Sequence, residues 1–311
     1  MIIARSLQEI THRPDSVVTV GTFDGLHLGH RAILSEVVQR ADARNARSVV
    51  ITFDPHPRAV LRGEAIQQLT TIDERLEWIG KLGLHATLVL EFTYAFSRLT
   101  PRDFYRQYVI EGVGVQEVVI GYDHLFGKDR EAGKEELQAM GTAFGFTTHV
   151  VGPVTVGGEV VSSSIIRELI LRGDVERAER FLQSPYSVSG EVVRGDGRGS
   201  GIGFPTANIR LTDERKLLPA NGVYLVAVRV GERQFHGMLN IGVRPTFHTD
   251  SKQVVEVNIF DFDEELYGTI IRVHFLKYVR PEAKFSTKEA LIEQLQADRN
   301  ACLKYITALQ P

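Results

Sequence analysis

The feature that most constrains the fold is an alternation, in the first half of the chain, of short apolar runs with segments of helical periodicity. The apolar runs are rich in valine and isoleucine and cover residues 16–20, 48–53, 86–92 and 117–121. After the first run, Leu34, Val37 and Ala41 recur at the spacing of one helical face, and helices are also expected at 73–81 and from Pro101. Strands that are apolar on both faces need cover on both sides, so this half predicts an α/β fold with a parallel sheet between helices.

The pattern changes after residue 182, where runs with period-two alternation are separated by turn residues. These runs cover residues 187–193, 224–228, 234–238, 254–260 and 270–275. Such a series predicts a small antiparallel barrel. A closing helix is expected near Ser286 and Glu289, which have capping-box spacing, with Cys302 on its apolar face. Because the two patterns meet at Gln183-Ser184-Pro185, we predict domains of residues 1–183 and 184–311.

Composition and charge exclude several classes of protein. The formal net charge is −3, whereas proteins that bind nucleic acid non-specifically usually carry an excess of positive charge. No apolar run approaches the roughly 18 residues of a membrane span, and the first six residues turn polar too soon for a signal peptide. A single cysteine allows no internal disulfide, which fits a reducing compartment. We therefore expect a cytoplasmic globular protein without a nucleic-acid or membrane partner, while nothing in the sequence indicates an oligomeric state.

A first group of polar residues and glycines lies between the first apolar run and the helix that follows it, where α/β sheets bind ligands. Its members are Gly21, Phe23, Asp24, His27, Gly29 and His30. His27 and His30 are three residues apart, so near a helix start they can face the same way. Two imidazoles there could donate hydrogen bonds to a phosphate as pyrophosphate departs. A bare His-x-x-His is more often a surface turn, but the glycine-rich lead-in at a strand end favours a nucleotide site.

A second group, Ser163, Ser164 and Arg167, begins a later helical segment. Serine hydroxyls at a helix start, together with an arginine, can clamp a phosphate. An ordinary serine-capped helix is the simpler interpretation of these residues taken alone. The sequence thus offers two segments of the first half as candidates for nucleotide binding.

These two segments together resemble the nucleotidyltransferase superfamily, with its His-x-Gly-His and Ser-Ser-Thr/Ser-x-Ile-Arg motifs. Thr52-Phe53-Asp54-Pro55-His56-Pro57 looks like the adenylyltransferase module of bacterial FAD synthetases, and so does the stretch from Gly121 to Lys128, where His124-Leu125 replaces an aromatic–arginine pair. The resemblance implies attack on the α-phosphate of ATP and flavin binding by Asp123 and Phe126. It further implies that ATP is held by Gly21, Phe23, Asp24, Gly29, Ser163, Ser164 and Arg167.

The second half contains an unusual glycine-rich passage from Arg194 to Asn208, with glycine at every second position from 195 to 203. Glycine permits positive φ and exposes successive N–H groups to an anion, and Arg198 can add positive charge. Thr206 and Asn208, two residues apart, share a face if they lie on a strand, and both offer neutral oxygens suited to Mg²⁺. The glycines by themselves fit a flexible surface loop equally well.

Glu256 lies in an alternating run in which Val255, Val257 and Ile259 face one way while Glu256 and Asn258 face the other. A carboxylate there could accept the proton of a substrate hydroxyl. Without further context, a solvent-facing strand glutamate is the more common interpretation.

The glycine-rich passage and the Glu256 strand resemble the riboflavin kinase family, with its Gly-Arg-x-x-Gly-Phe-Pro-Thr-Ala-Asn signature. The resemblance implies a six-stranded barrel with Glu256 as catalytic base and Thr206 and Asn208 as Mg²⁺ ligands. Further roles that it implies are ATP-phosphate binding by Gly197, Arg198, Gly203 and Pro205, and flavin binding by Arg244 and Thr246.

From Gly21 to about Phe285 the chain is similar to bacterial bifunctional riboflavin kinase/FAD synthetase. The resemblance implies a Rossmann-like adenylyltransferase domain that is followed by a kinase barrel. It also implies ATP as co-substrate, Mg²⁺ as cofactor, and riboflavin, FMN and FAD as substrates or products, with His27 and His30 acting in the second reaction. Two alternatives stay open: a flavin-binding regulator or carrier with inactive motifs, and an enzyme with only one of the two activities.

Overall fold

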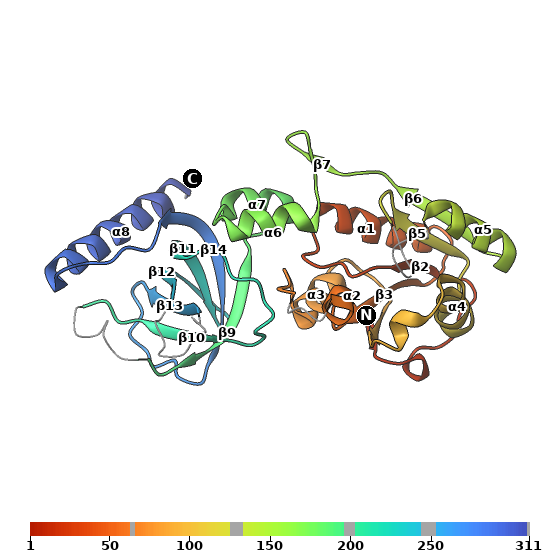
Figure 1. Ribbon diagram of the computed structural model, residues 1–311, viewed down its shortest axis with the longest axis horizontal. Helices are drawn as coiled ribbons and strands as arrows, with labels where there is room; N and C mark the ends of the chain where they lie inside the picture. The colour runs from red at the N-terminus through yellow and green to blue at the C-terminus, as the bar shows by residue number, and fades with distance from the viewer. Residues whose placement is uncertain (63–65, 125–132, 196–202, 244–252, 310–311) are drawn as a thin grey trace. The chain divides into compact units, whose positions relative to one another are not determined.

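The computed structural model describes residues 1–62, 66–124, 133–195, 203–243 and 253–309, and the chain forms two compact units, 1–163 and 164–311 (Figure 1). The boundary falls inside the predicted phosphate-binding segment, so that Ser163 belongs to the first unit and Ser164 and Arg167 belong to the second. The domain limits of 1–183 and 184–311 stay a prediction.

The first unit is built on a six-stranded sheet in which every neighbouring pair is parallel. The strands are β1 (Ile2–Ala4), β2 (Val17–Val20), β3 (Ser48–Asp54), β4 (Ala86–Glu91), β5 (Glu117–Gly121) and β6 (Thr147–Val151). Their order across the sheet is β1-β4-β3-β2-β5-β6. The parallel sheet predicted from doubly apolar runs is confirmed, and the two edge strands, β1 and β6, are additions that the sequence pattern did not predict.

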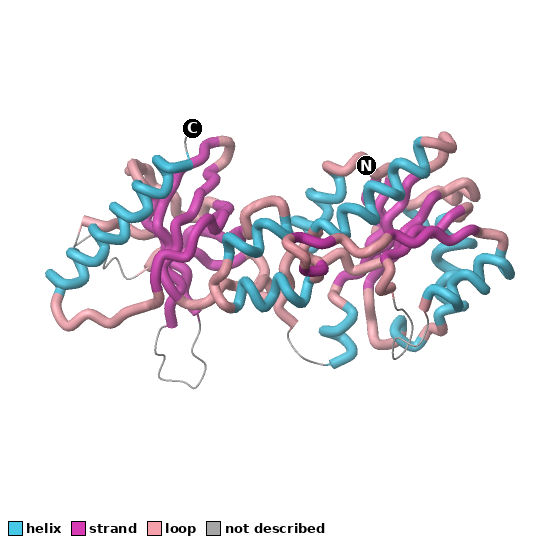
Figure 2. The backbone as a smooth tube through the Cα atoms, turned by 90° about the horizontal axis from the view of Figure 1, so that it is seen from above, coloured by secondary structure: helices cyan, strands magenta, loops and turns pink. Residues whose placement is uncertain are grey.

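Helices lie on both faces of this sheet, as Figure 2 shows. They are α1 (Leu28–Asp42), α2 (Pro57–Arg62), α3 (Ile72–Gly80), α4 (Pro101–Phe104), the π-helical η3 (Tyr105–Val113) and α5 (Lys134–Phe144). On one face, Val17 and Val50 share a buried cluster with Leu34 of α1. On the other, Val18 shares a cluster with Val109 of η3. Adjacent strand residues therefore enter different cores, which explains why these strands are apolar on both sides.

Shorter elements complete the first unit. They are the single turns η1 (Leu7–Glu9) and η2 (Phe96–Arg98) and the hairpin of β7 (Thr155–Val156) and β8 (Glu159–Val160). The hairpin leads through Val161 to the start of α6 (Ser163–Leu171).

The second unit is a closed barrel of six antiparallel strands in the order β10-β13-β12-β11-β14-β9. The strands are β9 (Ser187–Val193), β10 (Ala207–Leu211), β11 (Gly222–Val230), β12 (Arg233–Val243), β13 (Gln253–Ile259) and β14 (Ile270–Arg280). Burial alternates along β9, as one face fills the interior and the other does not. The predicted six-stranded antiparallel barrel is confirmed.

Three helices accompany the barrel. Helices α6 and α7 (Val175–Leu182) precede it, and Glu176 of α7 forms an ion pair with Lys277 of β14 at 3.3 Å. Helix α8 (Lys288–Leu309) covers part of the outer wall, where Cys302 is buried as expected. The capping-box expectation is wrong by one residue: Thr287 precedes the helix, and its hydroxyl accepts the Ala290 N–H at 3.2 Å.

Within the described ranges, no helix combines the length and the apolar character that a membrane crossing requires.

Candidate active sites

The first candidate site lies at the carboxyl ends of β2 and β5, which are neighbours in the middle of the sheet. From β2 the chain continues to β3 and β4 on one side, whereas β5 and β6 extend the sheet on the other. Strand order thus reverses between β2 and β5, and ligands of open α/β sheets bind at such switch points. The segment carrying His27 and His30 follows β2, and Asp123 follows β5. The predicted residues of both segments are therefore at the same edge of the sheet.

The imidazoles of His27 and His30 are stacked, with ring centroids 3.6 Å apart and an interplanar angle of 19°. His27 caps helix α1, because its Nδ1 accepts the backbone N–H of His30 at 3.3 Å. That hydrogen bond requires a lone pair on Nδ1, so a neutral His27 carries its proton on Nε2. The expectation that the two rings face the same way is confirmed. An Nε2–H donor and the positive end of the helix dipole then lie together, which suits a phosphate.

Two glycines make this packing possible. A Cβ added to Gly29 would lie 3.2 Å from Cε1 and Nδ1 of His27, which is tighter than ordinary packing allows. A Cβ added to Gly21 would lie 3.0 Å from the ring of Phe23. Phe23 is buried with φ at +50° and meets His30 edge-on at 5.4 Å. The glycines therefore allow aromatic side chains to lie directly against the backbone of the loop.

Asp24 is buried and holds the loop from inside. Its carboxylate accepts the N–H of Thr70 at 2.9 Å, the hydroxyl of Thr70 at 3.0 Å and the N–H of Leu69 at 3.2 Å. The Thr70 hydroxyl in turn accepts the N–H of Gly25 at 2.9 Å. Ser163 joins the same loop, since its hydroxyl donates to the Asp24 carbonyl at 3.0 Å. Asp24 and Ser163 thus brace the loop that carries the two histidines.

The remaining residues predicted for this site are placed as follows. Ser164 and Arg167 belong to the second unit, where they lie one turn apart on α6, with Ser164 exposed and Arg167 half-buried. Asp123 is exposed directly after β5, with its Oδ1 3.3 Å from the position of a Cβ on Gly121. Phe126 lies outside the described residues.

The second candidate site is a row of polar residues on the outer face of the barrel. Asn208 of β10 and Asn240 of β12 are each register partners of Glu256 on β13. Directly opposed residues have Cβ atoms about 4.5–5.5 Å apart, so the three side chains are neighbours. Val193 and Val223 end the row on either side. The carboxylate is thus flanked by two amides and then by apolar residues.

The register confirms the predicted alternation of the Glu256 strand. Val255 and Val257 are buried, whereas Glu256 is half-buried on the opposite face. Asn258, on the same face as Glu256, donates its Nδ2–H to the carbonyl of Pro205 at 2.7 Å. The strand that carries the predicted base therefore also anchors the end of the glycine-rich passage.

The described ends of the glycine-rich passage lie against this row. A Cβ on Gly195 would overlap Nδ2 of Asn208, so the amide rests against a backbone that has no side chain there. Gly203 has φ at +80°, in the left-handed region that favours glycine. Phe204 is buried in the apolar cluster under α8, and Thr206 is exposed directly before β10. The passage is therefore fixed to the barrel at both described ends.

Several predicted residues of the second site lie outside the described residues: Gly197, Arg198, Arg244 and Thr246. Asn240 has no individual role among the sequence-based predictions. Its register opposite Glu256 depends on a strand pairing that no local pattern indicates. The only sequence feature that could have indicated a role for Asn240 is its polarity within an otherwise apolar stretch of β12.

In comparisons with known proteins, the two halves of the chain match two different family models. The family model described as FAD synthetase matches residues 9–165, and the one described as riboflavin kinase matches residues 182–306. The bifunctional riboflavin kinase/FMN adenylyltransferase of Listeria monocytogenes is 37% identical over 298 residues, which cover 95% of this chain and 94% of the relative. The protein of the same description from Escherichia coli K12 is 32% identical over 315 residues, which cover 100% of both chains.

A solved structure also superimposes on nearly the whole chain. The crystal structure of a protein described as a macrolide-efflux protein from Streptococcus pneumoniae has a TM-score of 0.87 and 32% sequence identity. The match covers 97% of this chain and 98% of that protein.

Proposed function

Because the chain belongs to the bifunctional riboflavin kinase/FMN adenylyltransferase family, we propose which of its residues carry out the two reactions. The enzyme transfers the γ-phosphoryl group of ATP to riboflavin, which gives FMN. It then transfers the adenylyl group of ATP to FMN, which gives FAD and pyrophosphate. Riboflavin, FMN and ATP are its small-molecule substrates. The alternatives of a carrier and of a single-activity enzyme are thereby set aside.

In the kinase reaction, Glu256 accepts the proton of the terminal ribityl hydroxyl of riboflavin. The oxygen then attacks the γ-phosphorus, and the bond from that phosphorus to ADP breaks. The observation that supports this role is the row in which Glu256 lies between Asn208 and Asn240. A base in this position typically contributes about 10²–10⁴-fold to the rate.

Thr206 and Asn208 fit Mg²⁺ by the chemistry of their oxygens, a hydroxyl directly before β10 and an amide on that strand. Such a pair suits an ion whose other ligands are ATP phosphates and water. When bound, the ion would neutralise charge on the β- and γ-phosphates. Gly197, Arg198, Gly203 and Pro205 are proposed to hold those phosphates, and Arg244 and Thr246 to contact the flavin.

In the adenylyl transfer, a phosphate oxygen of FMN attacks the α-phosphorus of ATP, and the bond to pyrophosphate breaks. We assign His27 and His30 the donation of hydrogen bonds to phosphate oxygens whose charge grows in the transition state. The stacked rings at the start of α1 support this assignment, because they place two imidazoles where the helix offers N–H groups to an anion. No covalent enzyme intermediate is needed, since positioning and electrostatics suffice.

The other residues of the first site are proposed to bind the two substrates. ATP is proposed to bind against the loop that contains Gly21, Phe23, Asp24 and Gly29, in which the two glycines leave room for the Phe23 and His27 rings and Asp24 fixes the shape of the loop. Ser163, Ser164 and Arg167 are proposed to bind phosphates, and Asp123 and Phe126 to bind the flavin. We also propose a cytoplasmic location, which fractionation of cells followed by immunodetection would test.

One incubation tests the assignment of the first site. The full chain is supplied with riboflavin, ATP and Mg²⁺, and FMN and FAD are followed by chromatography. His30→Ala should abolish FAD formation, because it removes one of the two stacked imidazoles, while FMN accumulates. If this variant made FAD at the wild-type rate, or lost FMN formation as well while still folded, the assignment of the second reaction to the His27–His30 loop would be wrong.

A further inference from the structure

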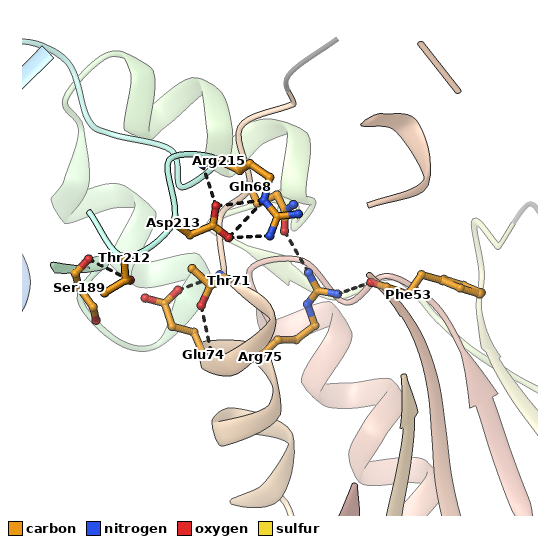
Figure 3. Close-up of polar contacts among 9 residues, drawn as sticks. All are labelled: Phe53, Gln68, Thr71, Glu74, Arg75, Ser189, Thr212, Asp213 and Arg215. Atoms are coloured by element: carbon orange, nitrogen blue, oxygen red, sulfur yellow. Dashed lines mark hydrogen bonds and ion pairs between the residues drawn. The ribbon is translucent and has the colours of Figure 1, made fainter. Parts of the chain in front are cut away.

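An arginine in the first unit is buried at the edge of the sheet that carries the His27–His30 loop. Arg75, on α3, is 1% exposed. Its Nη1 donates to the carbonyl of Phe53 at 3.1 Å, and its Nη2 donates to Oε1 of Gln68 at 3.4 Å (Figure 3). The same Nη1 also donates to the hydroxyl of Thr52 at 3.3 Å. Taking a guanidinium out of water is costly, and apolar side chains can fill such a position as well or better. Its burial at the carboxyl end of β3 therefore calls for a role beyond packing.

A second hydrogen bond extends this contact to the loop. The Thr52 hydroxyl, which accepts from Arg75, donates to the carbonyl of Thr22 at 3.3 Å. Thr22 lies next to Phe23, whose ring meets His30 edge-on. The guanidinium of Arg75 is thus connected to the loop through one buried hydroxyl, and Thr52 itself is fully buried.

The segment that begins α3 holds the same loop from another side. Leu69 and Thr70 bind the carboxylate of Asp24. The next residue, Thr71, caps α3: its hydroxyl accepts the N–H of Glu74 at 3.2 Å, and Glu74 accepts the N–H of Thr71 at 3.0 Å. Arg75 follows this capping box directly. The start of α3 is therefore connected to the loop by two sets of hydrogen bonds, one to Asp24 and one through Thr52.

We propose that Arg75 is a positioning residue for adenylyl transfer, which acts by holding the loop of residues 21–30 through Thr52. The inference rests on the proposed role of that loop in FAD formation. Catalysis depends on the placement of the phosphate donors, and a displacement of about 1 Å can cost on the order of 10²-fold in rate. Loss of the hydrogen bond from Arg75 to Thr52 should therefore lower kcat for FAD formation more than it raises the KM values for FMN and ATP.

The test measures kcat and KM for FMN and for ATP in the full chain carrying Arg75→Met, Arg75→Lys or Thr52→Val. We expect Arg75→Met to lower kcat about 10–100-fold and to raise either KM less than about 3-fold. Arg75→Lys should recover part of the rate, because lysine keeps the charge and the ability to donate hydrogen bonds but not the planar fork. Thr52→Val keeps the shape of the strand residue, removes only the hydroxyl, and should lower kcat in the same direction by a smaller factor.

Two controls separate positioning from folding. Riboflavin kinase activity of the same molecules should stay at the wild-type level, since its proposed residues lie in the second unit. Arg106→Met, at an exposed arginine paired with Asp103, should leave FAD formation unchanged. The thermal unfolding of each variant is recorded, and rates are compared well below its transition.

The outcomes distinguish the role of Arg75 from the proposed role of the His27–His30 loop in FAD formation. Wild-type kcat in both Arg75→Met and Thr52→Val would overturn it, and so would a rate loss fully explained by the fraction of unfolded protein. If His30→Ala abolishes FAD formation while Arg75→Met does not, only the role of Arg75 fails. If His30→Ala is itself active, the role of the loop fails and the inference fails with it.

Discussion

Asn208 lies directly opposite Glu256 on neighbouring antiparallel strands of the barrel. The pairing brings an amide from the end of the glycine-rich passage to the carboxylate proposed as base. A cross-strand pair of this kind depends on the barrel register and not on the local sequence, so a substitution that keeps side-chain size should leave the barrel intact. The roles of Asn208, Glu256 and Asn240 can therefore be tested by substitutions that change functional groups and keep the size of the side chain.

Glu256→Gln should lower the kcat of riboflavin phosphorylation by about 10²–10⁴-fold, because the amide cannot accept the hydroxyl proton. The amide has nearly the volume of the carboxylate, so the row beside Asn208 and Asn240 keeps its packing. FAD formation from supplied FMN serves as the internal control and should be unchanged. Steady-state rates with each flavin give the result, and a variant that phosphorylates riboflavin normally would remove Glu256 from the mechanism.

Mg²⁺ removal gives a test of Thr206 and Asn208. We expect a chelator to abolish FMN formation and added Mg²⁺ to restore it. Asn208→Ala should raise the Mg²⁺ concentration for half-maximal kinase rate by about 10-fold, since losing one ligand of a weakly held ion costs roughly 1.4 kcal/mol. Titration of the kinase rate with Mg²⁺ measures this. An unchanged midpoint would place the ion elsewhere.

Gly29→Ala should slow FAD formation by about 10-fold or more, because its Cβ would press on the His27 ring from 3.2 Å. Alanine is the better helix former by roughly 1 kcal/mol, so the variant should not be less stable in its own helix. The matched control is Gly80→Ala, where the added Cβ meets only Met1 at an ordinary 3.5 Å. Activity lost in Gly29→Ala and kept in Gly80→Ala, at similar unfolding temperatures, is the expected pair of results.

Cys302 should react slowly with thiol reagents in the native protein. Burial, and to a smaller extent the negative charge of Asp298, raises the pKa of the Cys302 thiol from its usual 9.0 to about 11. The folded state thus holds this proton more tightly than the unfolded state. The corresponding stability is fully present below pH 9 and is lost as the pH rises through about 11.

Alkylation followed by mass spectrometry measures this reactivity. Labelling of Cys302 should be fast in denaturant and slow in buffer at neutral pH, and it should accelerate in buffer as the pH approaches 11. Equal rates in buffer and in denaturant at neutral pH would show that α8 does not cover the thiol.

Sequence patterns predicted the central strands well because these strands are buried on both faces. The edge strands were not predicted, because they are less buried and so have less apolar sequences. Strand β1 has only three residues, two of which are exposed, and β6 begins with two threonines and is only partly buried. Strand β12 was predicted over 234–238 only, because Asn240 and Gly242 interrupt the apolar alternation beyond that point. In the structure the strand continues to Val243.

The site residues divide in a similar way. Residues in local motifs, such as His27, His30 and Glu256, could be proposed from the sequence. The partners that hold them could not, because they are distant along the chain: Asp24 binds Leu69 and Thr70, 45 and 46 positions away. Arg75 has no motif of its own, and only the three-dimensional contact with Thr52 indicates a role.

The two units differ in how their sheets end. The barrel closes on itself, so each of its six strands has a neighbour on both sides. Among the described residues, the parallel sheet stops at β1 and β6, and each of these strands has a neighbour on one side only. Unpaired strand edges can template the addition of a second molecule. Self-association during refolding or concentration should therefore start in the FAD-forming half, and hydrogen exchange on early oligomers should show new protection at Ile2–Ala4 or Thr147–Val151.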